Sequence, residues 1–414
     1  MIKRNRTLLL IGCMLLLLSG CSKPEAVDEL LDKVGLGEDS AKETLTMDDV
    51  DSSARDCEWI EENSDDCFEE KKHSKYAYKQ LSEKEKLWYK DINTLLAYRY
   101  DGPLKLDEEG LKQGLDEENV DKIYNAVMID HPEYFYVDGY EYTVYTRGEK
   151  TVGIEITARY TLDKESCLSR MEEIQEAAED ILYYAPETDD DYEKIKYVYE
   201  TVIYHTDYDM EAEDNQNIYS VLVGDVSVCQ GYAKATQYLL NQMDVECSMV
   251  YGQVRDGEYH SWNVVKSNGD YYHLDTTWGD ASYSVETDGA ASGTTPQINY
   301  DYLCITTDQI TKTHKIKEVV DLPVCDSDED NYYIREGNYF YEYDTDQLDE
   351  VFYDAYDAGS EMVTLKCDSK ELYDEFYAKL VDEQQIFEYL YEEYDSISYV
   401  ENEEQLTMTF WMTK

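Results

Sequence analysis

Three residues in one stretch of the chain carry the side chains that a thiol enzyme needs. Cys229 offers a nucleophilic sulfur, His260 an imidazole that can take up and return a proton, and Asp275 a carboxylate that can orient that imidazole. A thiol becomes a strong nucleophile when a base removes its proton, and the base works best when a third group holds it in place. These residue types therefore indicate covalent catalysis at a carbonyl group, provided that the fold brings them together.

The residues around Cys229 predict a helix that places this cysteine in its first turn. Ser227 and Gln230 have the Ser-x-x-Gln spacing of a capping box, which predicts a helix start at Ser227. Apolar residues at helical spacing then extend the helix to about Met243. Unpaired N–H groups and the positive end of the helix dipole favour a thiolate at such a position. Gly231 leaves room for another group to approach the backbone closely.

A hairpin turn predicts that His260 and Asp275 lie close together. Asn268-Gly269 is the favoured pair for a two-residue type I′ turn. Counting back from this turn gives the strand pairs Ser267–Asp270, Val264–His273, Trp262–Asp275 and His260–Thr277. Side chains alternate between the two faces of a strand, so His260 and Asp275 are expected to be diagonal neighbours on one face. A slip of one residue in the pairing would put them on opposite faces.

These positions predict a role for each of the three residues. His260 would take the thiol proton and later act as a general acid. Asp275 would hold one imidazole tautomer and stabilise the charged ring. The backbone N–H of Cys229 would stabilise an oxyanion, and the second donor is not identified by the sequence. Taken singly, Cys229 could instead be a buried apolar residue and His260 a structural histidine.

The segments V-C-Q-G-Y-A, H-S-W-N-V-V and Y-Y-H-L-D-T-T-W-G-D resemble the core of the transglutaminase-like superfamily, which is related in fold and triad to papain-like cysteine proteases. The resemblance covers about Asp189 to Ile316. It implies an α+β fold with a papain/transglutaminase-like core, in which a nucleophile helix packs on an antiparallel sheet, between α+β flanking regions. It also implies Cys229 as nucleophile, His260 as base and Asp275 as third member of the triad.

The reaction stays open, because this family includes cross-linking acyltransferases, peptidases, amidases and members that have lost activity. We expect a thiol enzyme that attacks an amide of a protein or peptide, cell-wall peptide included, and forms a thioester. Hydrolysis is the expected default, because no feature of the sequence would exclude water from an open site; transfer to an amine is the other outcome. The alternative from another class is a non-catalytic surface module that binds wall peptides or partner proteins through the same cleft.

The N-terminus resembles the signal of a bacterial lipoprotein. Three basic residues precede an apolar run, Leu8 to Leu18, and the residues Leu-Ser-Gly-Cys that end at Cys21 resemble a lipobox. The apolar run is too short to span a bilayer comfortably, which fits a cleaved signal. The resemblance implies cleavage before Cys21, attachment of lipid to its sulfur, and a protein anchored at the extracytoplasmic face of the bacterial cell membrane.

The charge balance excludes one class of partner. The chain has 36 Lys and Arg against 93 Asp and Glu, a formal net charge of −57 at pH 7. Binding to the phosphate backbone of a nucleic acid needs a basic surface, so nucleic acid is excluded as a main partner. The 6 histidines are scattered and the chain has no HExxH, no paired CxxC and no P-loop. We therefore expect no metal and no other cofactor.

The remaining sequence predicts how the chain is divided. The expected segments are a signal peptide at 1–20, an acidic tether at 21–75, an N-terminal α+β region at 76–165, the transglutaminase-like core at 166–322 and a C-terminal α+β region at 323–414. A capping box formed by Ser82 and Glu85 predicts a helix start. Residues 141–146 and 152–160 are expected to form a hairpin. We predict a loop at 283–296, a strand at 300–305 and a strand pair at 332–341.

Overall fold

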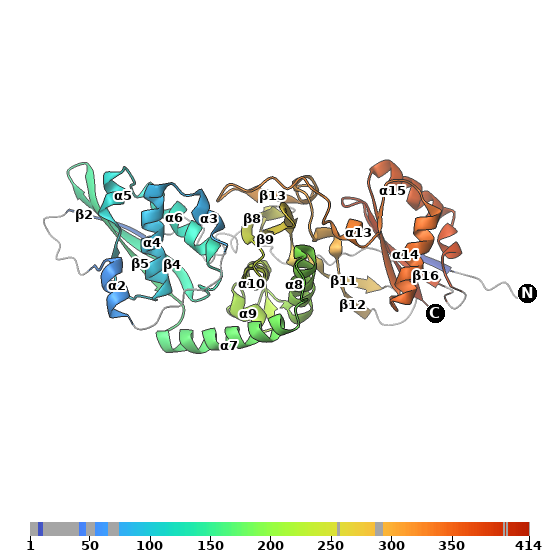
Figure 1. The fold of residues 1–414 in the computed structure, drawn as a ribbon, viewed down its shortest axis with the longest axis horizontal. Helices are drawn as coiled ribbons and strands as arrows, with labels where there is room; N and C mark the ends of the chain where they lie inside the picture. The colour runs from blue at the N-terminus through green and yellow to red at the C-terminus, as the bar shows by residue number, and fades with distance from the viewer. Residues whose placement is uncertain are drawn as a thin grey trace, which may run out of the picture. The chain divides into compact units, whose positions relative to one another are not determined.

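The structure of the protein is a computed structural model (Figure 1). It describes residues 7–10, 41–46, 54–64, 74–254, 257–285, 293–391, 394 and 396–413. The chain forms two compact units. The N-terminal unit comprises Gly20–Thr277 and His314–Val324, and the C-terminal unit comprises Met1–Ser19, Trp278–Thr313 and Cys325–Lys414. No helix among the described residues is long and apolar enough to cross a membrane.

The first part of the N-terminal unit is a four-stranded sheet with helices packed on it. The strand order is β2-β4-β5-β3. Its elements are β2 (Ala41–Thr46), α2 (Cys57–Asn63), α3 (Tyr76–Gln80), α4 (Glu83–Ala97), β3 (Leu104–Lys105), α5 (Glu108–Lys112), α6 (Glu118–Asp130), β4 (Val137–Arg147) and β5 (Lys150–Tyr160). The predicted capping box at Ser82 and Glu85 begins α4, and β4 and β5 form the predicted hairpin. Both predictions are confirmed.

The segment expected to be an acidic tether contains ordered elements. Strand β2 pairs in parallel with β4, and α2 packs on α4. Cys57 and Ile60 of α2 are buried, and the Cys57 thiol donates a hydrogen bond to Oδ1 of Asp91 at 3.0 Å. The tether expected at 21–75 is therefore too long. One buried pair three residues apart is too short a pattern to predict a packed helix from the sequence.

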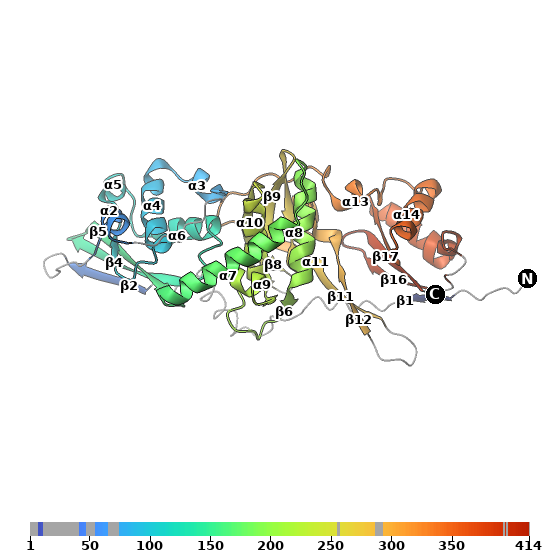
Figure 2. The same ribbon diagram turned by 60° about the horizontal axis from the view of Figure 1, so that its bottom comes forward.

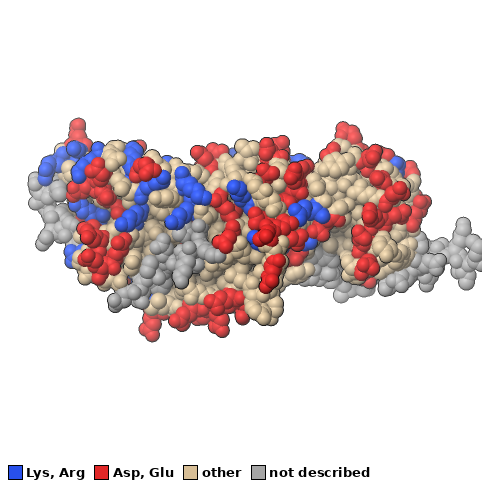
Figure 3. Space-filling view, in the orientation of Figure 1, with Lys and Arg blue, Asp and Glu red and all other residues tan. Residues whose placement is uncertain are grey.

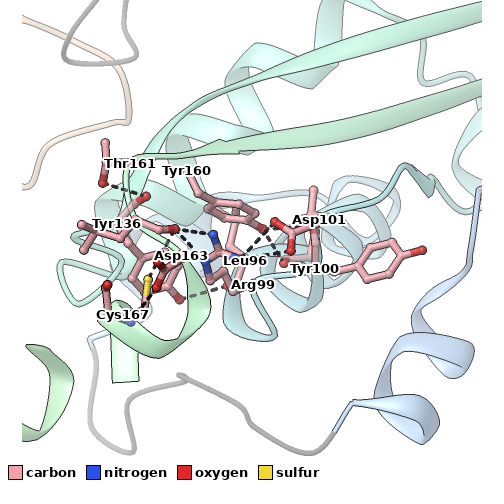
Figure 4. A network of polar contacts seen from close by, with 12 residues as sticks. Leu96, Arg99, Tyr100, Asp101, Tyr136, Tyr160, Thr161, Asp163 and Cys167 are labelled. Atoms are coloured by element: carbon pink, nitrogen blue, oxygen red, sulfur yellow. Dashed lines mark hydrogen bonds and ion pairs between the residues drawn. The ribbon is translucent and has the colours of Figure 1, made fainter. Parts of the chain in front are cut away.

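A buried arginine joins the end of α4 to the start of α7 (Lys164–Tyr183), the helix that follows β5, as Figure 4 shows. Arg99 has a positive φ of 46°. Its guanidinium donates to the carbonyl oxygen of Leu162 at 3.1 Å and pairs with Asp101 at 3.0 Å. It also lies 4.6 Å from the ring centroid of Tyr160. Because Leu162 lies just ahead of α7, these contacts fix the direction in which α7 leaves the sheet.

The second part of the N-terminal unit contains the segment that the sequence singled out. Its sheet has the order β10-β9-β8-β13, with every neighbouring pair antiparallel. After α7 follow α8 (Asp191–His205), β6 (Asp207–Tyr208), α9 (Ile218–Leu222), β7 (Val226–Ser227), α10 (Cys229–Gln242), β8 (Cys247–Val254), β9 (Glu258–Ser267), β10 (Asp270–Leu274) and β13 (His314–Lys317). Helix α10 packs on β8, β9 and α8 (Figure 2). The predicted α+β class, with the cysteine-bearing helix on an antiparallel sheet, is confirmed.

The C-terminal unit has a five-stranded sheet of order β1-β16-β17-β15-β14 and a separate hairpin, β11-β12. Its elements are β1 (Thr7–Leu10), β11 (Asp280–Val285), β12 (Gly293–Ile298), η3 (Tyr300–Tyr302), α12 (Thr307–Ile310), α13 (Tyr332–Arg335), β14 (Tyr339–Phe340), α14 (Thr345–Asp357), β15 (Met362–Cys367), α15 (Lys370–Phe376), η4 (Tyr377–Asp382), η5 (Gln385–Glu388), β16 (Ser396–Asn402) and β17 (Thr407–Thr413). Helix α11 (Thr276–Gly279) lies where the chain passes from one unit to the other. The sheet and α14 bury a common apolar cluster that includes Phe340, Phe352, Leu365 and Phe410.

Three predictions for this unit are wrong. Both ends of the expected loop at 283–296 lie in strands of the β11-β12 hairpin, residues 283–285 in β11 and 293–296 in β12, and residues 286–292 lie outside the described residues. The expected strand at 300–305 begins as a 3-10 helix, and the expected strand pair at 332–341 begins as helix α13. Both short helices follow an asparagine, Asn299 or Asn331, whose side chain accepts a backbone N–H of the first turn. These caps outweigh the β-propensity of the tyrosines that follow.

Most of the predicted signal peptide, and Cys21 with it, lies outside the described residues. The described part, Thr7–Leu10, pairs in parallel with β16. The signal and the lipid attachment therefore stay predictions. Figure 3 shows acidic side chains along α7 and over the C-terminal unit, whereas basic side chains, Lys and Arg, gather over the first part of the N-terminal unit.

Candidate active site

Helix α10 begins at Cys229, two residues later than the sequence predicts. Val228 is the N-cap residue and no side chain caps the helix, so the expected capping box of Ser227 and Gln230 is wrong. The Ser227 hydroxyl is buried and donates instead to the carbonyl oxygen of Asn215 at 2.7 Å. The consequence is that the first N–H groups of α10, that of Cys229 included, are not used by a side-chain cap.

Gly231 allows the chain before α9 and α10 to pack tightly on the first turn of α10. A Cβ atom at this position would lie 1.9 Å from Oγ of Ser227 and 3.1 Å from the carbonyl oxygen of Asn217. The Ser227 hydroxyl cannot move away easily, because it also shares a 2.8 Å hydrogen bond with Ser220. The predicted close approach at Gly231 is thereby confirmed, and its partner is the neighbouring backbone and hydroxyl.

The hairpin that carries His260 has the predicted turn but is shorter than predicted. Asn268 and Gly269 both have positive φ, 49° and 112°, as a type I′ turn requires. The pairs Ser267–Asp270 and Val264–His273 form as expected. Strand β10 then ends at Leu274, so the expected pairs Trp262–Asp275 and His260–Thr277 do not form. Thr277 lies in α11, because its N–H and the Asp275 side chain close a turn there at 3.0 Å.

His260 and Asp275 nevertheless meet. His260 donates from Nε2 to Oδ2 of Asp275 at 2.8 Å, and both residues are buried. Cys229, partly buried at the start of α10, lies close enough to the same imidazole to help raise its pKa. Because Nε2 is engaged by the carboxylate, Nδ1 is the ring nitrogen that remains for the sulfur. The structure thus brings together all three residues that the sequence singled out.

One hydrogen bond fixes the strand of His260 against the helix of Cys229. Asn263 is fully buried on β9 and donates from Nδ2 to the carbonyl oxygen of Ala233 in α10 at 3.0 Å. A buried amide that meets a helix carbonyl sets the distance between strand and helix, because breaking the bond would leave both groups desolvated. This bond therefore helps to hold the imidazole at the sulfur.

A second histidine, which sequence reasoning missed, also binds Asp275. His314 is the first residue of β13 and donates from Nε2 to the same Oδ2 atom at 3.0 Å. With the N–H of Thr277 on Oδ1, the carboxylate receives three donors. The residues around His314 form no motif that would pair it with Asp275, which lies 39 residues earlier in the chain.

The charges in this group stabilise one another. Burial alone would lower the pKa of His260, but the charge and hydrogen bond of Asp275, with a smaller contribution from Cys229, raise it to about 10. Burial alone would raise the pKa of Asp275, but His260 and His314 hold it well below its usual range. His260 is therefore an imidazolium and Asp275 a carboxylate at neutral pH. An imidazolium beside a thiol is the environment in which a cysteine acts as a nucleophile.

Trp262 and His273 complete the buried surroundings. The indole N–H of Trp262 donates to Nδ1 of His273 at 3.1 Å, and its ring lies edge-on to His314 at a centroid distance of 5.0 Å. Burial, with the charge of His314, lowers the pKa of His273 to about 4. His273 is therefore neutral and accepts from the tryptophan. It takes no part in the contact between His260 and Asp275.

One group of three side chains among the described residues could hold a metal ion. His260, Asp275 and His314 place their ligand atoms within 4.8 Å of one another. Here, however, both histidines donate an N–H to one carboxylate oxygen, which is the arrangement of a hydrogen-bonded network. A metal would have to displace both of these buried bonds. We therefore assign no metal to this group.

A cavity of about 570 Å³ opens beside Cys229 and His260. It is lined by several aromatic and apolar side chains of the N-terminal unit, among them Tyr124, Met128, Phe135, Met210, Tyr251 and Tyr259. Gln230 of α10 and Lys317 of β13 also face it. The lining also includes the carboxylates of Asp138, Glu211, Glu213 and Asp214, so apolar and charged groups are mixed in it. Pockets of this size are typical of sites for a peptide segment or small molecule.

One family model matches part of the chain. Residues 183–276 match the family model described as the transglutaminase-like superfamily, a range that holds Cys229, His260 and Asp275. No curated protein matches the chain.

Solved structures with distant likeness include one described as a TGase, with 13% identity, a TM-score of 0.25 and coverage of 41% of this chain and 57% of the other. Another is a protein from Cytophaga hutchinsonii proposed to be a cysteine protease, with 13% identity, a TM-score of 0.23 and coverage of 31% of this chain and 54% of the other. The chain thus spans little more than half the length of these two proteins. On the family match, residues 183–276 form a transglutaminase-like domain.

Proposed function

We propose that this protein is a thiol enzyme that transfers acyl groups from amides of proteins or peptides, with Cys229 as nucleophile, His260 as acid and base, and Asp275 as orienting carboxylate. The observation that carries the proposal is the chain of contacts from sulfur to imidazole to carboxylate, with 2.8 Å between Nε2 of His260 and Oδ2 of Asp275. The cavity beside Cys229 offers space for the substrate.

In the first half of the proposed reaction, Cys229 and His260 react as a thiolate–imidazolium pair, in which the thiol proton has already moved to the imidazole. The sulfur of Cys229 attacks the amide carbonyl and an S–C bond forms. The oxygen becomes an oxyanion, which the N–H of Cys229 at the start of α10 can stabilise. The imidazolium of His260 gives its proton to the leaving nitrogen, and the C–N bond breaks. An amine leaves and a thioester remains.

In the second half, water or a second amine attacks the thioester. His260, now neutral, takes a proton from the attacking group, and the S–C bond breaks. Water gives a carboxylic acid, so that the overall reaction is hydrolysis; an amine gives a new amide and hence a cross-link. We propose hydrolysis as the main outcome, because the cavity is open to solvent and water is always present.

We further propose that the protein is held at the extracytoplasmic face of a bacterial membrane through lipid on Cys21. The support is the resemblance of the N-terminus to a lipoprotein signal. Labelling cells with a fatty acid analogue tests this directly: the label should enter the wild-type protein and should not enter a Cys21→Ala variant. A labelled variant would contradict the assignment.

The reaction is tested on the full-length protein in mild detergent, with Cys229→Ala as the inactive variant. Cys247→Ala is the matched control, because this cysteine is fully buried in β8. Each protein is incubated with glutamine-containing proteins and wall peptides, with and without a fluorescent primary amine, and the products are identified by mass spectrometry.

Cleavage or deamidation that is lost only in Cys229→Ala would establish a hydrolase. Amine incorporation with the same dependence would establish an acyltransferase. Equal product patterns for wild type and Cys229→Ala across the panel would contradict the proposal and favour the non-catalytic binding module.

A further inference from the structure

A single lysine on the helix of Cys229 faces the cavity of the candidate active site. Lys234 lies in the second turn of α10 and lines the same cavity as Cys229 and His260. Gln230, four residues earlier and therefore on the same side of the helix, lines it too. Because helical side chains lean towards the N-terminus of their helix, the Lys234 chain extends back towards the turn that holds Cys229.

The ammonium of Lys234 has no partner among the described residues, although the chain has 93 acidic residues. No hydrogen bond and no ion pair of its Nζ atom is formed with any residue the structure describes. The nearest influence is the charge of Asp214, which itself pairs with Arg170 and accepts from Asn217. Lys234 is only partly exposed, and burial lowers its pKa to about 8, against the opposing effect of Asp214.

This arrangement differs from that of an ordinary surface lysine. A lysine whose ammonium reaches water keeps its usual pKa, because the ammonium stays hydrated and no desolvation free energy is lost. An ammonium that is drawn into a cavity loses hydration, and this loss is unfavourable when none of the described carboxylates that line the cavity forms an ion pair with it. The charge would be compensated if an anion entered the cavity from outside the chain.

We propose that Lys234 is a subsite for a carboxylate of the acyl donor, held in the cavity beside Cys229. This inference rests on the proposed function and names the substrate class: an amide whose acyl part carries a free carboxylate. Examples are a peptide with an acidic side chain just before the attacked bond and a C-terminal glutamine attacked at its side-chain amide. The carboxylate would form a charge-assisted hydrogen bond with Nζ of Lys234.

The other charged groups of the cavity explain why a substrate carboxylate should bind only beside Lys234. The carboxylates that line it are Asp138, Glu211, Glu213 and Asp214, and the remaining titratable groups are Cys229, His260, Lys317 and the tyrosines 124, 208, 251 and 259. The negative charges do not pair with Lys234, and they repel an anion elsewhere in the cavity. A carboxylate is therefore favoured only where it meets Lys234, whereas Lys317 is exposed at the edge.

The test measures how fast Cys229 reacts with pairs of thiol reagents that differ only in a carboxylate. The pairs are iodoacetate with iodoacetamide, and 6-maleimidohexanoate with its primary amide, because the two lengths sample different distances from the sulfur. The full-length protein in mild detergent is used, and modification of Cys229 is quantified at the peptide level by mass spectrometry. The readout is the ratio of the acid rate to the amide rate.

Three variants are compared with the wild type. Lys234→Met keeps the length and removes the charge, Lys234→Arg keeps the charge, and Lys317→Met removes the other lysine of the cavity. For at least one reagent pair, the acid-to-amide ratio should fall about tenfold in Lys234→Met, the loss expected for one hydrogen bond to a charged group. It should be kept in Lys234→Arg and in Lys317→Met. In the wild type it should fall as the pH rises through about 8, where Lys234 loses its proton.

Several results would overturn the subsite. They are unchanged ratios in Lys234→Met, an equal fall in Lys317→Met, or a wild-type ratio that is constant through pH 8. In each case fast reaction of Cys229 with the neutral reagents would leave the proposed enzyme intact. Slow reaction of Cys229 with every reagent would instead refute the proposed function, and the subsite with it. The pH dependence needs no variant, so it decides the question even if Lys234→Met does not fold.

Discussion

Replacing Asp275 by asparagine should abolish the imidazolium at neutral pH. Asparagine keeps the size of the side chain and removes the charge that raises the pKa of His260 to about 10. Burial then acts without opposition, so the pKa of His260 should fall to its usual 6.5 or below. A fall from about 10 to 6.5 corresponds to ~5 kcal/mol of interaction between the two side chains.

The direct assay is the NMR titration of the imidazole C–H signals between about pH 5 and pH 11. The His260 signal is identified by its absence in His260→Ala, and the exposed His205 serves as a reference in the same spectra. In the wild type the His260 signal should shift near pH 10, and in Asp275→Asn near pH 6.5 or lower. At pH 8, where the imidazole of the variant should be neutral, the rate of Cys229 alkylation by iodoacetamide should fall in parallel, because the sulfur loses the neighbouring cation.

The raised pKa of His260 also predicts how the unfolding free energy depends on pH. A histidine whose pKa is raised on folding contributes its full stabilisation below the unfolded value of about 6.5 and loses it as the pH rises towards 10. The difference in unfolding free energy between wild type and Asp275→Asn should therefore shrink across that interval. A wild-type signal that titrates near pH 6.5, or an unchanged signal in the variant, would refute the electrostatic reasoning.

Three further perturbations have definite expected outcomes. His314→Leu should lower kcat about tenfold with a smaller change in KM, since Asp275 loses one donor, and His314→Gln should restore part of the rate because it can donate again. Gly231→Ala should lower the unfolding free energy by about 1–3 kcal/mol in urea titrations, whereas Gly153→Ala, where a Cβ meets only ordinary contacts, should change it little. Glu85→Ala should cost ~1 kcal/mol at pH 7. That cost should disappear as the pH falls from about 4.5 to about 2, because the cap and Lys122 hold the Glu85 pKa low against its burial.

The local features of the site could be predicted from the sequence because each depends on neighbouring residues. Asn268-Gly269 fixes a type I′ turn, and two positive φ angles are found there. Helical periodicity after Cys229 predicts α10, and Gly231 signals a close approach. The capping box was predicted wrongly because its outcome depends on competing partners. Ser227 could cap the helix, but its hydroxyl binds the carbonyl oxygen of Asn215 in the preceding loop and the hydroxyl of Ser220 in α9 instead.

The contact between His260 and Asp275 was predicted correctly for a partly incorrect reason. The expected register requires β10 to continue to Thr277, but the strand ends at Leu274. The Asp275 side chain then accepts the N–H of Thr277 and turns the chain into α11. One carboxylate oxygen closes this turn while the other accepts from His260, so the end of the strand and the orientation of the carboxylate have the same cause.

His314 shows why the matched domain and the site do not have the same limits. The family match ends at residue 276, which includes Cys229, His260 and Asp275. The chain then leaves the N-terminal unit at Trp278 and returns at His314, where β13 adds the edge strand to the sheet through β8. Only this return supplies the second imidazole on Oδ2 of Asp275. No local pattern can predict such a contact, because its two halves are joined by a segment that folds with the other unit. It follows that the carboxylate of the candidate triad reaches its full set of donors only when the chain folds beyond the family match.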